Sequence, residues 1–492
     1  MRRLNPIDNA FLLAEGRNQP LHVGALCVFH PPAGASPDFV AEIADRMRAS
    51  NSASPPFNRR LESHWGVKSW VESQDFDIGQ HFVHLSLPKP GRILELLSMV
   101  SRVHSAHLDR AYPLWRTYLI EGIEDGRIAL YSKIHHSLVD GVAGIRLMIK
   151  SMSEDPIASM QLPAPWELRP TATRNKSIPA VAFGSTAAAI QMARDGLTSA
   201  PTVVRHLRQV ITDFRSENPY LVTSFQAPNS ILNDRISGSR RFAAQSYSTP
   251  RIRQIARTLD TTVNDVVLSL CGGALRRYLG ELGALPDEPL VAVVPVSVRR
   301  DNSETGNEIA MAMANLGTHL ADPVERVRLV KGCMDYNKTM LKGMTPTQIM
   351  AYSAAVLAPG AFTLLPGVKN HRRAANLVIS HVRGPQVDTY WQGCKLDGIY
   401  PASLVLGGFA LNITLISRHD NIDFGIIACR RSLPSVQRLL IHLEEAIAEL
   451  ETVLGLSYDP ATESEDCKAI SGYCLYPRTG SEKLDGQMTT AA

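Results

Sequence analysis

Short apolar runs and alternating apolar residues occur throughout the chain and predict β-strands. The predicted strands span about residues 22–30, 81–87, 114–121, 127–134, 241–247, 290–298, 376–382, 410–417 and 422–429. Apolar residues spaced three and four apart predict helices at about residues 37–47, 92–107, 141–152, 263–282, 323–341 and 435–454. Each half of the chain therefore mixes strands and helices, which fits two α/β sandwiches.

Residues that favour helix ends flank two of these helices. Ser36 is expected to cap the first, with Pro37 at its first position. Thr262 and Asp265 predict a capping box at the start of the helix near 263. Capping explains Asp265, but the neighbouring Asn264 is a mediocre helix former, so its amide is a candidate for donating a hydrogen bond into a cleft.

Length and local composition predict two domains. A chain of 492 residues exceeds what one hydrophobic core usually supports. A stretch rich in proline and polar residues, followed by a helical pattern, separates the two halves as a linker would. We expect an N-terminal domain at 1–175, a helical linker at 176–225, a C-terminal domain at 226–458 and a disordered tail at 459–492.

The helical part of the linker leaves two roles open. The helix has four apolar residues clustered on one face, which favours packing against the two domains: Val204, Leu207, Val210 and Ile211. Arg205 and Arg208 would also suit an amphipathic helix lying on an anionic membrane. We prefer the packing role.

Composition narrows the classes of partner. The chain is 45% hydrophobic and 20% charged, as in an ordinary globular protein, and 51 Lys and Arg nearly balance 47 Asp and Glu. This balance argues against nucleic acid as the main partner. Seven scattered cysteines form no CxxC pair and no zinc-site spacing, which indicates a reducing cytoplasm. Polar residues interrupt what would have to be the apolar core of a signal peptide near residue 8.

Two long segments carry no charge. Residues 343–368 and 398–417 contain no Asp, Glu, Lys or Arg, but prolines and glycines break both before the roughly 20 residues that a membrane helix needs. We expect neither to span a membrane. We expect segments 344–368 and 398–417 to line an apolar cavity or to touch a lipid surface.

Two adjacent histidines, His135 and His136, follow an apolar strand and precede Gly141 and a helical pattern. A histidine in such a turn can accept and return a proton near neutral pH, because its ordinary pKa is about 6.5. Each residue also has an ordinary structural interpretation: Asp140 could cap the following helix, and either histidine could be a core residue. The combination at this spacing favours a functional site.

Other common signatures of catalysis are missing from the sequence. There is no GxSxG, GxxxxGK[ST], HExxH or GxGxxG pattern. His104 and His107 are three residues apart on a predicted helix, but no third metal ligand is evident, and a packing or solvated role is preferred.

Residues 135–141 match HHxxxDG, and the chain therefore resembles the CoA-dependent acyltransferase superfamily, which includes condensation domains. Additional matches, from about residue 4 to 455, narrow the resemblance to the bacterial wax ester synthase/diacylglycerol acyltransferase family. These matches are Asp8 with Phe11-Leu12, Pro113-Leu114-Trp115, Asn264-Asp265, residues 295–299 and Gly306-Asn307. One segment departs from the family: Asn-Val-Pro-Gly-Pro is replaced by residues 381–385, His-Val-Arg-Gly-Pro, so His381 and Arg383 receive no role.

The resemblance implies a fold and a division of roles. It implies two chloramphenicol-acetyltransferase-like α/β sandwich domains joined by a helical linker, with the active site between them. His136 would be the general base, and His135 mainly structural. Asp140 would brace the loop, with Arg299 as a candidate partner, and Gly141 would permit close chain approach. Asn264 would stabilise the oxyanion or orient substrate.

The resemblance also implies the substrates. The alcohol would attack a fatty acyl-CoA directly, without a covalent acyl-enzyme. The expected partners are acyl-CoA, a long-chain alcohol or diacylglycerol, and a membrane or lipid inclusion touched peripherally from the cytoplasm. Acyl-CoA would be a substrate, and no permanently bound cofactor or metal is expected.

Two other functions are weighed against this one. A condensation-type enzyme fed by carrier proteins predicts a GGxS-like serine nearby, but residues 407–410 read Gly-Gly-Phe-Ala. A catalytically silent lipid-binding protein would tolerate a broken motif, whereas HHxxxDG is whole here. We prefer the enzyme.

Overall fold

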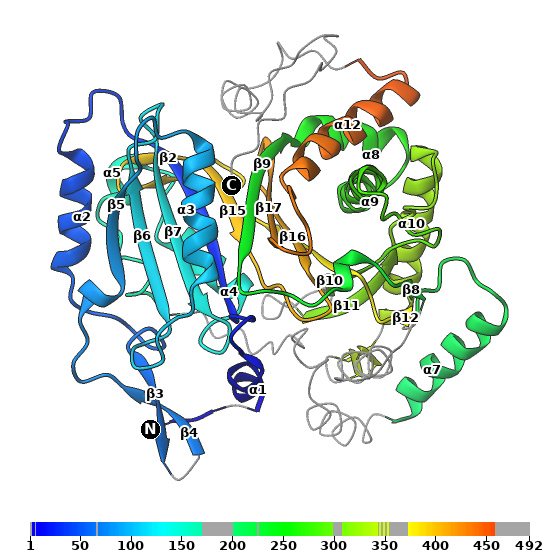
Figure 1. The fold of residues 1–492 in the computed structure, drawn as a ribbon, viewed down its shortest axis with the longest axis horizontal. Helices are drawn as coiled ribbons and strands as arrows, with labels where there is room; N and C mark the ends of the chain where they lie inside the picture. Colours follow the sequence, from blue (N-terminus) through cyan, green and yellow to red (C-terminus); the bar gives the residue numbers. More distant parts are fainter. Residues whose placement is uncertain are drawn as a thin grey trace.

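Two six-stranded sheets form the framework of the protein and stand side by side in Figure 1. The structure is a computed structural model. It describes residues 2–4, 6–64, 67–169, 200–223, 226–298, 308–342, 344–345, 348–349, 352–353 and 372–457. The mixed α/β class with two sheet-containing domains is confirmed.

The first sheet has the strand order β14-β15-β2-β7-β6-β5. Its strands are Tyr390–Trp391 (β14), Cys394–Ala402 (β15), His22–His30 (β2), Ile128–His135 (β7), Trp115–Glu121 (β6) and Phe82–Ser86 (β5). Nearly all residues of β2 and β7 are buried, because both faces of this sheet are covered. The strands predicted at 114–121 and 127–134 pair as the antiparallel hairpin β6–β7, and Gly126 adopts the positive φ that its turn requires.

The second sheet has the order β11-β10-β13-β16-β17-β9. Its strands are Glu308–Asn315 (β11), Val291–Val298 (β10), Leu377–Arg383 (β13), Leu411–Ser417 (β16), Asn421–Cys429 (β17) and Arg240–Ser248 (β9). The three strands β10, β13 and β16 are parallel, while the hairpin β16–β17 is antiparallel. The sequence predicted every strand of this sheet except β11.

Helices cover the outer faces of both sheets (Figure 1). The longer helices are Phe39–Ala49 (α2), Ile93–Ser105 (α3), Gly141–Lys150 (α4), Ala200–Arg215 (α7), Thr249–Thr258 (α8), Val263–Glu281 (α9), Pro323–Leu341 (α10) and Arg438–Val453 (α12). Helix α9 contacts α8, α10 and α12 and is buried around most of its circumference. Its predicted capping box of Thr262 and Asp265 is confirmed.

Shorter elements complete the described fold. They are the helices Pro6–Ala14 (α1) and Pro156–Ser159 (α5), the 3-10 turns Ile78–Gln80 (η1) and Ile231–Asn233 (η4), and the short strands Arg2–Arg3 (β1), Arg59–His64 (β3), Val67–Glu72 (β4), Ala227–Pro228 (β8) and Arg372–Arg373 (β12).

The predicted start of the first long helix is wrong by two residues. Helix α2 begins at Phe39 with Asp38 as N-cap, because Ser36 is part of a turn in which its carbonyl accepts from the Phe39 amide at 3.1 Å. The proline at 37 therefore precedes the helix. This shift changes no residue of the candidate site.

Strand β15 comes from the second half of the chain but pairs with β2 in the first sheet. The second half of the chain therefore contributes a strand to the first sheet, and the two sheets are joined by this strand as well as by packing. The boundaries at 175 and 226 stay predictions, since residues 170–199 lie outside the described part, as does the tail from 458 onward. Among the described residues, no helix is both long and apolar enough to cross a membrane.

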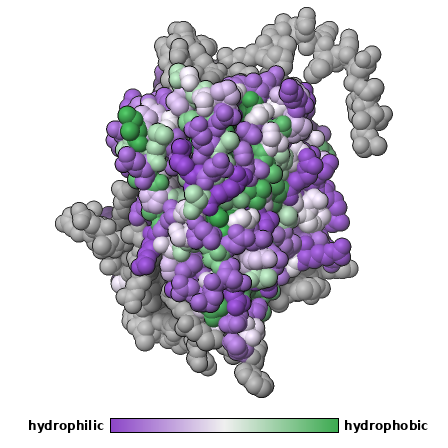
Figure 2. Space-filling view, turned by 90° about the vertical axis from the view of Figure 1, so that its left-hand side faces the viewer, coloured by the Kyte–Doolittle hydropathy of each residue, from purple (hydrophilic) through white to green (hydrophobic). Residues whose placement is uncertain are grey.

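Hydrophilic residues cover most of the described surface on the α2 side of the molecule, and hydrophobic residues show there in small groups (Figure 2). The apolar residues gather instead in the interior, in one large cluster between the second sheet and its helices and another around the first sheet. Between these two cores lies a pocket.

Candidate active site

The pocket is walled by both sheets. Strands β2 and β7 and helix α4 form one wall, and β10, β11, β13 and β16 form the other. The end of β15 and the segment after it also line the pocket, with residues between 401 and 409. Most lining side chains are apolar. The polar ones are Ser132, His136, Asp140, Ser380, Ser403, Asn412 and Thr414. Such a pocket suits an apolar ligand that carries a reactive polar group.

The turn between β7 and α4 carries the histidines and is fixed by backbone hydrogen bonds. The His135 amide donates to Leu114 and the His136 amide to Leu21, both at 2.9 Å. The Leu138 amide closes the turn on the His135 carbonyl at 2.9 Å. Neighbouring strands therefore hold the turn from both sides.

His136 lines the pocket and is partly buried. Its ring stacks on Phe11, with ring centroids 4.2 Å apart and an interplanar angle of 18°. Burial lowers the pKa of His136 to about 4, although the nearby Asp140 carboxylate acts in the opposite direction. The imidazole is therefore neutral at pH 7 and able to accept a proton.

His135 is buried behind His136 and does not line the pocket described here. Its Nδ1 accepts a hydrogen bond from the Ser137 amide at 3.2 Å and lies 2.7 Å from Ser137 Oγ. Because an amide can only donate, the proton of the neutral ring belongs on Nε2. That nitrogen lies 3.6 Å from Glu15 Oε1.

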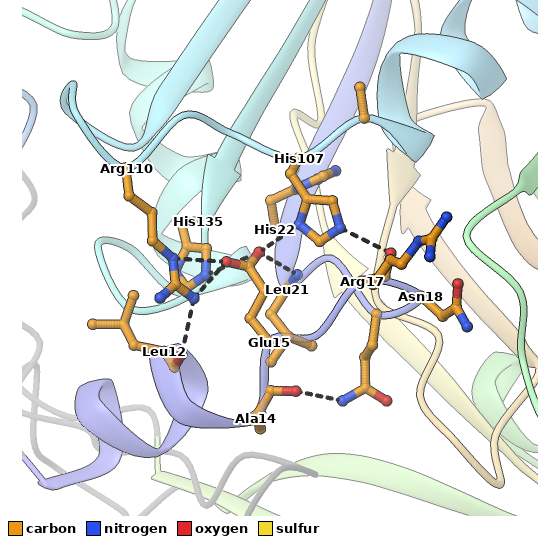
Figure 3. A network of polar contacts seen from close by, with 12 residues as sticks. Leu12, Ala14, Glu15, Arg17, Asn18, Leu21, His22, His107, Arg110 and His135 are labelled. Atoms are coloured by element: carbon orange, nitrogen blue, oxygen red, sulfur yellow. Dashed lines mark hydrogen bonds and ion pairs between the residues drawn. The ribbon is translucent and has the colours of Figure 1, made fainter.

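Glu15 is the centre of a polar network (Figure 3). Its side chain is only 6% exposed, and Arg110 Nη2 donates to its Oε2 at 2.8 Å. The Leu21 amide donates to Oε1 at 3.2 Å, and His107 Nδ1 lies 3.4 Å from the same oxygen. Burial alone would raise the pKa of Glu15, but His135, Arg110 and the Leu21 amide together lower it to about 2.

The sequence analysis overlooked the roles of Phe11 and Glu15. Phe11 entered there only as a family match, and Glu15 was given no role. The two residues are four apart, Phe11 in the last turn of α1 and Glu15 directly after the helix, and each reaches one of the paired histidines. This i, i+4 spacing was the signal in the sequence.

Asp140 is confirmed as a helix N-cap. Its Oδ1 accepts from the Ala143 amide at 2.8 Å, and the residue also lines the pocket. Its candidate partner Arg299 lies outside the described residues. The expected close chain approach at Gly141 is wrong for the described residues: a Cβ built there meets no atom within 4 Å, because this glycine opens toward the pocket.

Asn264 is not among the residues that line the described pocket. Its Oδ1 lies 3.3 Å from Nδ1 of His381 on β13, and burial lowers the pKa of His381 to about 4. The neighbours of His381 on that strand, Ser380 and Val382, do line the pocket. Asn264 therefore lies behind the wall, and its predicted role as a donor stays a prediction.

The two histidines considered as metal ligands have different partners. His104 Nδ1 lies 2.6 Å from the Tyr131 hydroxyl, whereas His107 Nε2 contacts the Arg17 carbonyl at 3.2 Å. The described residues contain no group of three His, Cys, Asp or Glu side chains placed to hold a metal ion.

Of the two uncharged segments, residues 398–417 contribute to the pocket through Pro401, Leu404, Phe409 and their neighbours. Most of residues 344–368 lie outside the described part of the chain. The expected apolar lining therefore finds support in the second segment, and the first stays a prediction.

Two family models match the chain. The wax ester synthase/diacylglycerol acyltransferase catalytic domain matches residues 4–267, and the WS/DGAT C-terminal domain matches residues 305–451. An O-acyltransferase WSD from Acinetobacter baylyi is 46% identical over 463 residues, covering 94% of this chain and all of that protein. A putative diacylglycerol O-acyltransferase of Mycobacterium tuberculosis is 43% identical, covering 92% of this chain and all of that protein.

Solved structures agree with these relatives. A wax ester synthase/diacylglycerol acyltransferase from Marinobacter aquaeolei VT8 has a TM-score of 0.76 and 40% identity, covering 93% of this chain and all of that one. The first condensation domain of the calcium-dependent antibiotic synthetase has a TM-score of 0.55 at 14% identity, covering 94% and 97% of the two chains, and is similar in fold alone.

Proposed function

Because the chain belongs to the wax ester synthase/diacylglycerol acyltransferase family, we propose that it transfers a long-chain acyl group from acyl-CoA to a fatty alcohol, to diacylglycerol, or to both. Its relatives are named O-acyltransferases, and this chain is an O-acyltransferase as well. The observation that carries the finer proposal is a neutral His136 at the wall of an apolar pocket between two sheets.

His136 acts as the general base in this proposal. It takes the proton of the acceptor hydroxyl while the hydroxyl oxygen attacks the thioester carbonyl, forming a tetrahedral intermediate. The carbon–sulfur bond then breaks, and the protonated imidazole returns its proton to the CoA sulfur. The carbonyl carbon exchanges one bond to sulfur for one to oxygen, so no acyl-enzyme is required.

The other residues support this step. Asp140 caps α4 and braces the turn, and its carboxylate favours the imidazolium that forms on His136. Asn264 contacts His381 on the wall strand β13, next to Ser380, which lines the pocket, and its role as a donor to the oxyanion or the substrate is part of this proposal. The apolar lining binds the fatty chain, since each buried methylene contributes about 0.8 kcal/mol.

The test is a purified-protein assay with palmitoyl-CoA, offered hexadecanol or diacylglycerol, that follows free CoA and the ester product. Ester formation with either acceptor supports the proposal, and the ratio of the two rates defines the preference. CoA release without ester would indicate hydrolysis. No release with either acceptor would favour the silent lipid-binding protein.

The activity should be insensitive to pH across the neutral range. The pKa of His136 is lowered to about 4, so its basic form is present above that value and is lost below it. We expect kcat/KM to stay flat from about pH 8 to pH 5.5 and to fall about tenfold per unit below about pH 4.

Acid also weakens the fold at this residue. The unfolded chain binds a proton at His136 below about pH 6.5 and the folded protein only near 4, so stability falls between those values. Activity that recovers on return to pH 7 separates titration from unfolding. A drop in kcat/KM centred near pH 6.5 would contradict the assigned base.

Helix α7 is our candidate for peripheral contact with a membrane or lipid inclusion. Val210 packs inward, but the packing predicted for Ile211 is wrong, because its side chain is 53% exposed. Phe214 is 58% exposed, and both residues lie near the exposed Arg208 and Arg215. Replacing Ile211 and Phe214 with serine should weaken binding to vesicles rich in anionic lipid by about tenfold.

The matched control changes Leu282 and Val387, which are 42% and 52% exposed elsewhere on the molecule, to serine. Vesicle flotation measures both double variants at low and high salt. Equal binding by the two variants would remove α7 from this role.

A further inference from the structure

We propose that Glu15 is a positioning residue for acyl transfer: its buried carboxylate fixes His135 and Leu21, and through them the turn that presents His136 to the pocket. This inference rests on the proposed role of His136 as base. The argument follows from how the two carboxylate oxygens are used (Figure 3).

The two oxygens of Glu15 have separate partners. Oε2 accepts from Arg110 Nη2 at 2.8 Å and Nε at 3.2 Å, an ion pair that compensates for burying the charge. Oε1 faces Leu21, His107 and His135. Arg110 therefore keeps the carboxylate ionised and in place, while Oε1 is free to organise the histidine turn.

The first link from Oε1 runs through the backbone of Leu21. The Leu21 amide donates to Oε1 at 3.2 Å, and the Leu21 carbonyl accepts from the His136 amide at 2.9 Å. One residue thus connects the carboxylate to the backbone of the proposed base. A shift of Glu15 would be transmitted to His136 without any intervening flexible side chain.

The second link runs through His135. Its Nε2 is fully buried, and no hydrogen-bond partner lies within 3.5 Å of it among the described residues. Glu15 Oε1, at 3.6 Å, is the acceptor that this nitrogen faces. Since Ser137 occupies Nδ1, the carboxylate favours the tautomer protonated on Nε2. His135 is thereby held in one orientation behind His136.

Helix α1 completes the arrangement. Phe11 stacks on the ring of His136 and accepts, through its carbonyl, the Glu15 amide at 3.0 Å. The same helical turn thus contacts both histidines. Glu15 sets the position of the turn, and Phe11 limits rotation of the catalytic ring.

The test is Glu15→Gln. Both carboxylate oxygens face donors, so whichever way the amide is placed, its NH₂ group meets another donor. We expect kcat to fall about 10- to 100-fold, as small misplacements of a catalytic group do, with KM for palmitoyl-CoA changed by less than about twofold. Glu15→Asp keeps the charge and should recover part of the lost kcat.

The matched control is Glu451→Gln. Glu451 is also a largely buried carboxylate, paired with Arg251 at 2.8 Å, but it lies outside the pocket lining. It should lose stability and retain kcat. An equal loss of kcat in both variants, or a Glu15→Gln enzyme within about threefold of wild type, would overturn the inference.

Arg110→Gln allows the inference to be tested even if Glu15→Gln does not fold. It removes the ion-pair partner of Oε2 and a hydrogen bond to the Leu12 carbonyl but keeps the Glu15 side chain, so its loss of kcat should be smaller than that of Glu15→Asp, which withdraws both oxygens. The reverse order would overturn the inference. His136→Ala separates the failure of the proposed function from the failure of this inference. An active His136→Ala enzyme contradicts the role of His136 as base. An inactive His136→Ala enzyme together with a fully active Glu15→Gln enzyme contradicts only the inference about Glu15.

Discussion

Replacing His136 with alanine is expected to lower kcat by about 10²- to 10⁴-fold, the usual contribution of a general base. The variant should still fold, because His136 is only partly buried and its main contact is the stack on Phe11. Its backbone hydrogen bond to Leu21 does not need the imidazole. KM for acyl-CoA should change little, since the apolar walls that bind the chain stay in place.

The matched control is His419→Ala. His419 is 71% exposed at the tip of a hairpin and pairs with Asp420, so its loss should leave kcat unchanged. CoA release and ester formation measure activity, and circular dichroism with thermal melting checks the fold of both variants. Near-normal turnover by a folded His136→Ala enzyme would remove His136 from the chemistry.

The strand and the turn that carry His136 were predictable because their signals are local. Apolar residues in β7, followed by polar residues and a glycine, predict a strand that ends at a turn. Asp140 was readable as an N-cap for the same reason. The strands and the helix that hold the histidines could therefore be predicted from local sequence alone, without knowledge of the tertiary structure.

The partners of His135 could not be predicted in this way. Glu15, Arg110 and His107 come from segments far from residue 135 in the chain and meet only in the folded protein. Asn264 is a second example, since its side chain contacts His381 and is not among the residues that line the described pocket. Local patterns identify which residues are unusual, but the fold decides what they face.

The pairing of β15 with β2 could not be predicted from the sequence for a related reason. The sequence of β15 mixes apolar residues with Lys395, Asp397 and Pro401, and nothing in it specifies that β2, at the other end of the chain, will be its neighbour. This pairing matters for the site, because the end of β15, at Pro401 and Ala402, and the residues after it line the pocket. The connection of the two sheets through β15 thus determines the shape of the pocket.

Asp423 on β17 lies at the centre of this connection between the two sheets and is fully buried. Its carboxylate accepts from Arg418 Nε at 2.7 Å, from Ser246 Oγ on β9 at 2.5 Å and from the Ile399 amide on β15 at 2.8 Å. Arg418 in turn donates to the backbone carbonyl of Asp397 on β15. One carboxylate therefore connects strands of both sheets.

Asp423→Ala should lower the free energy of unfolding by about 3 to 5 kcal/mol, because it leaves the Arg418 guanidinium buried without its carboxylate. Asp388→Ala is the control: Asp388 is 65% exposed and pairs with Lys395 at 3.2 Å, so its loss should cost less than about 1 kcal/mol. Denaturant titration at pH 7 compares the two. A loss below about 1 kcal/mol for Asp423→Ala would show that the sheets are held by apolar packing alone, and the position of the pocket wall would then depend on residues other than this ion pair.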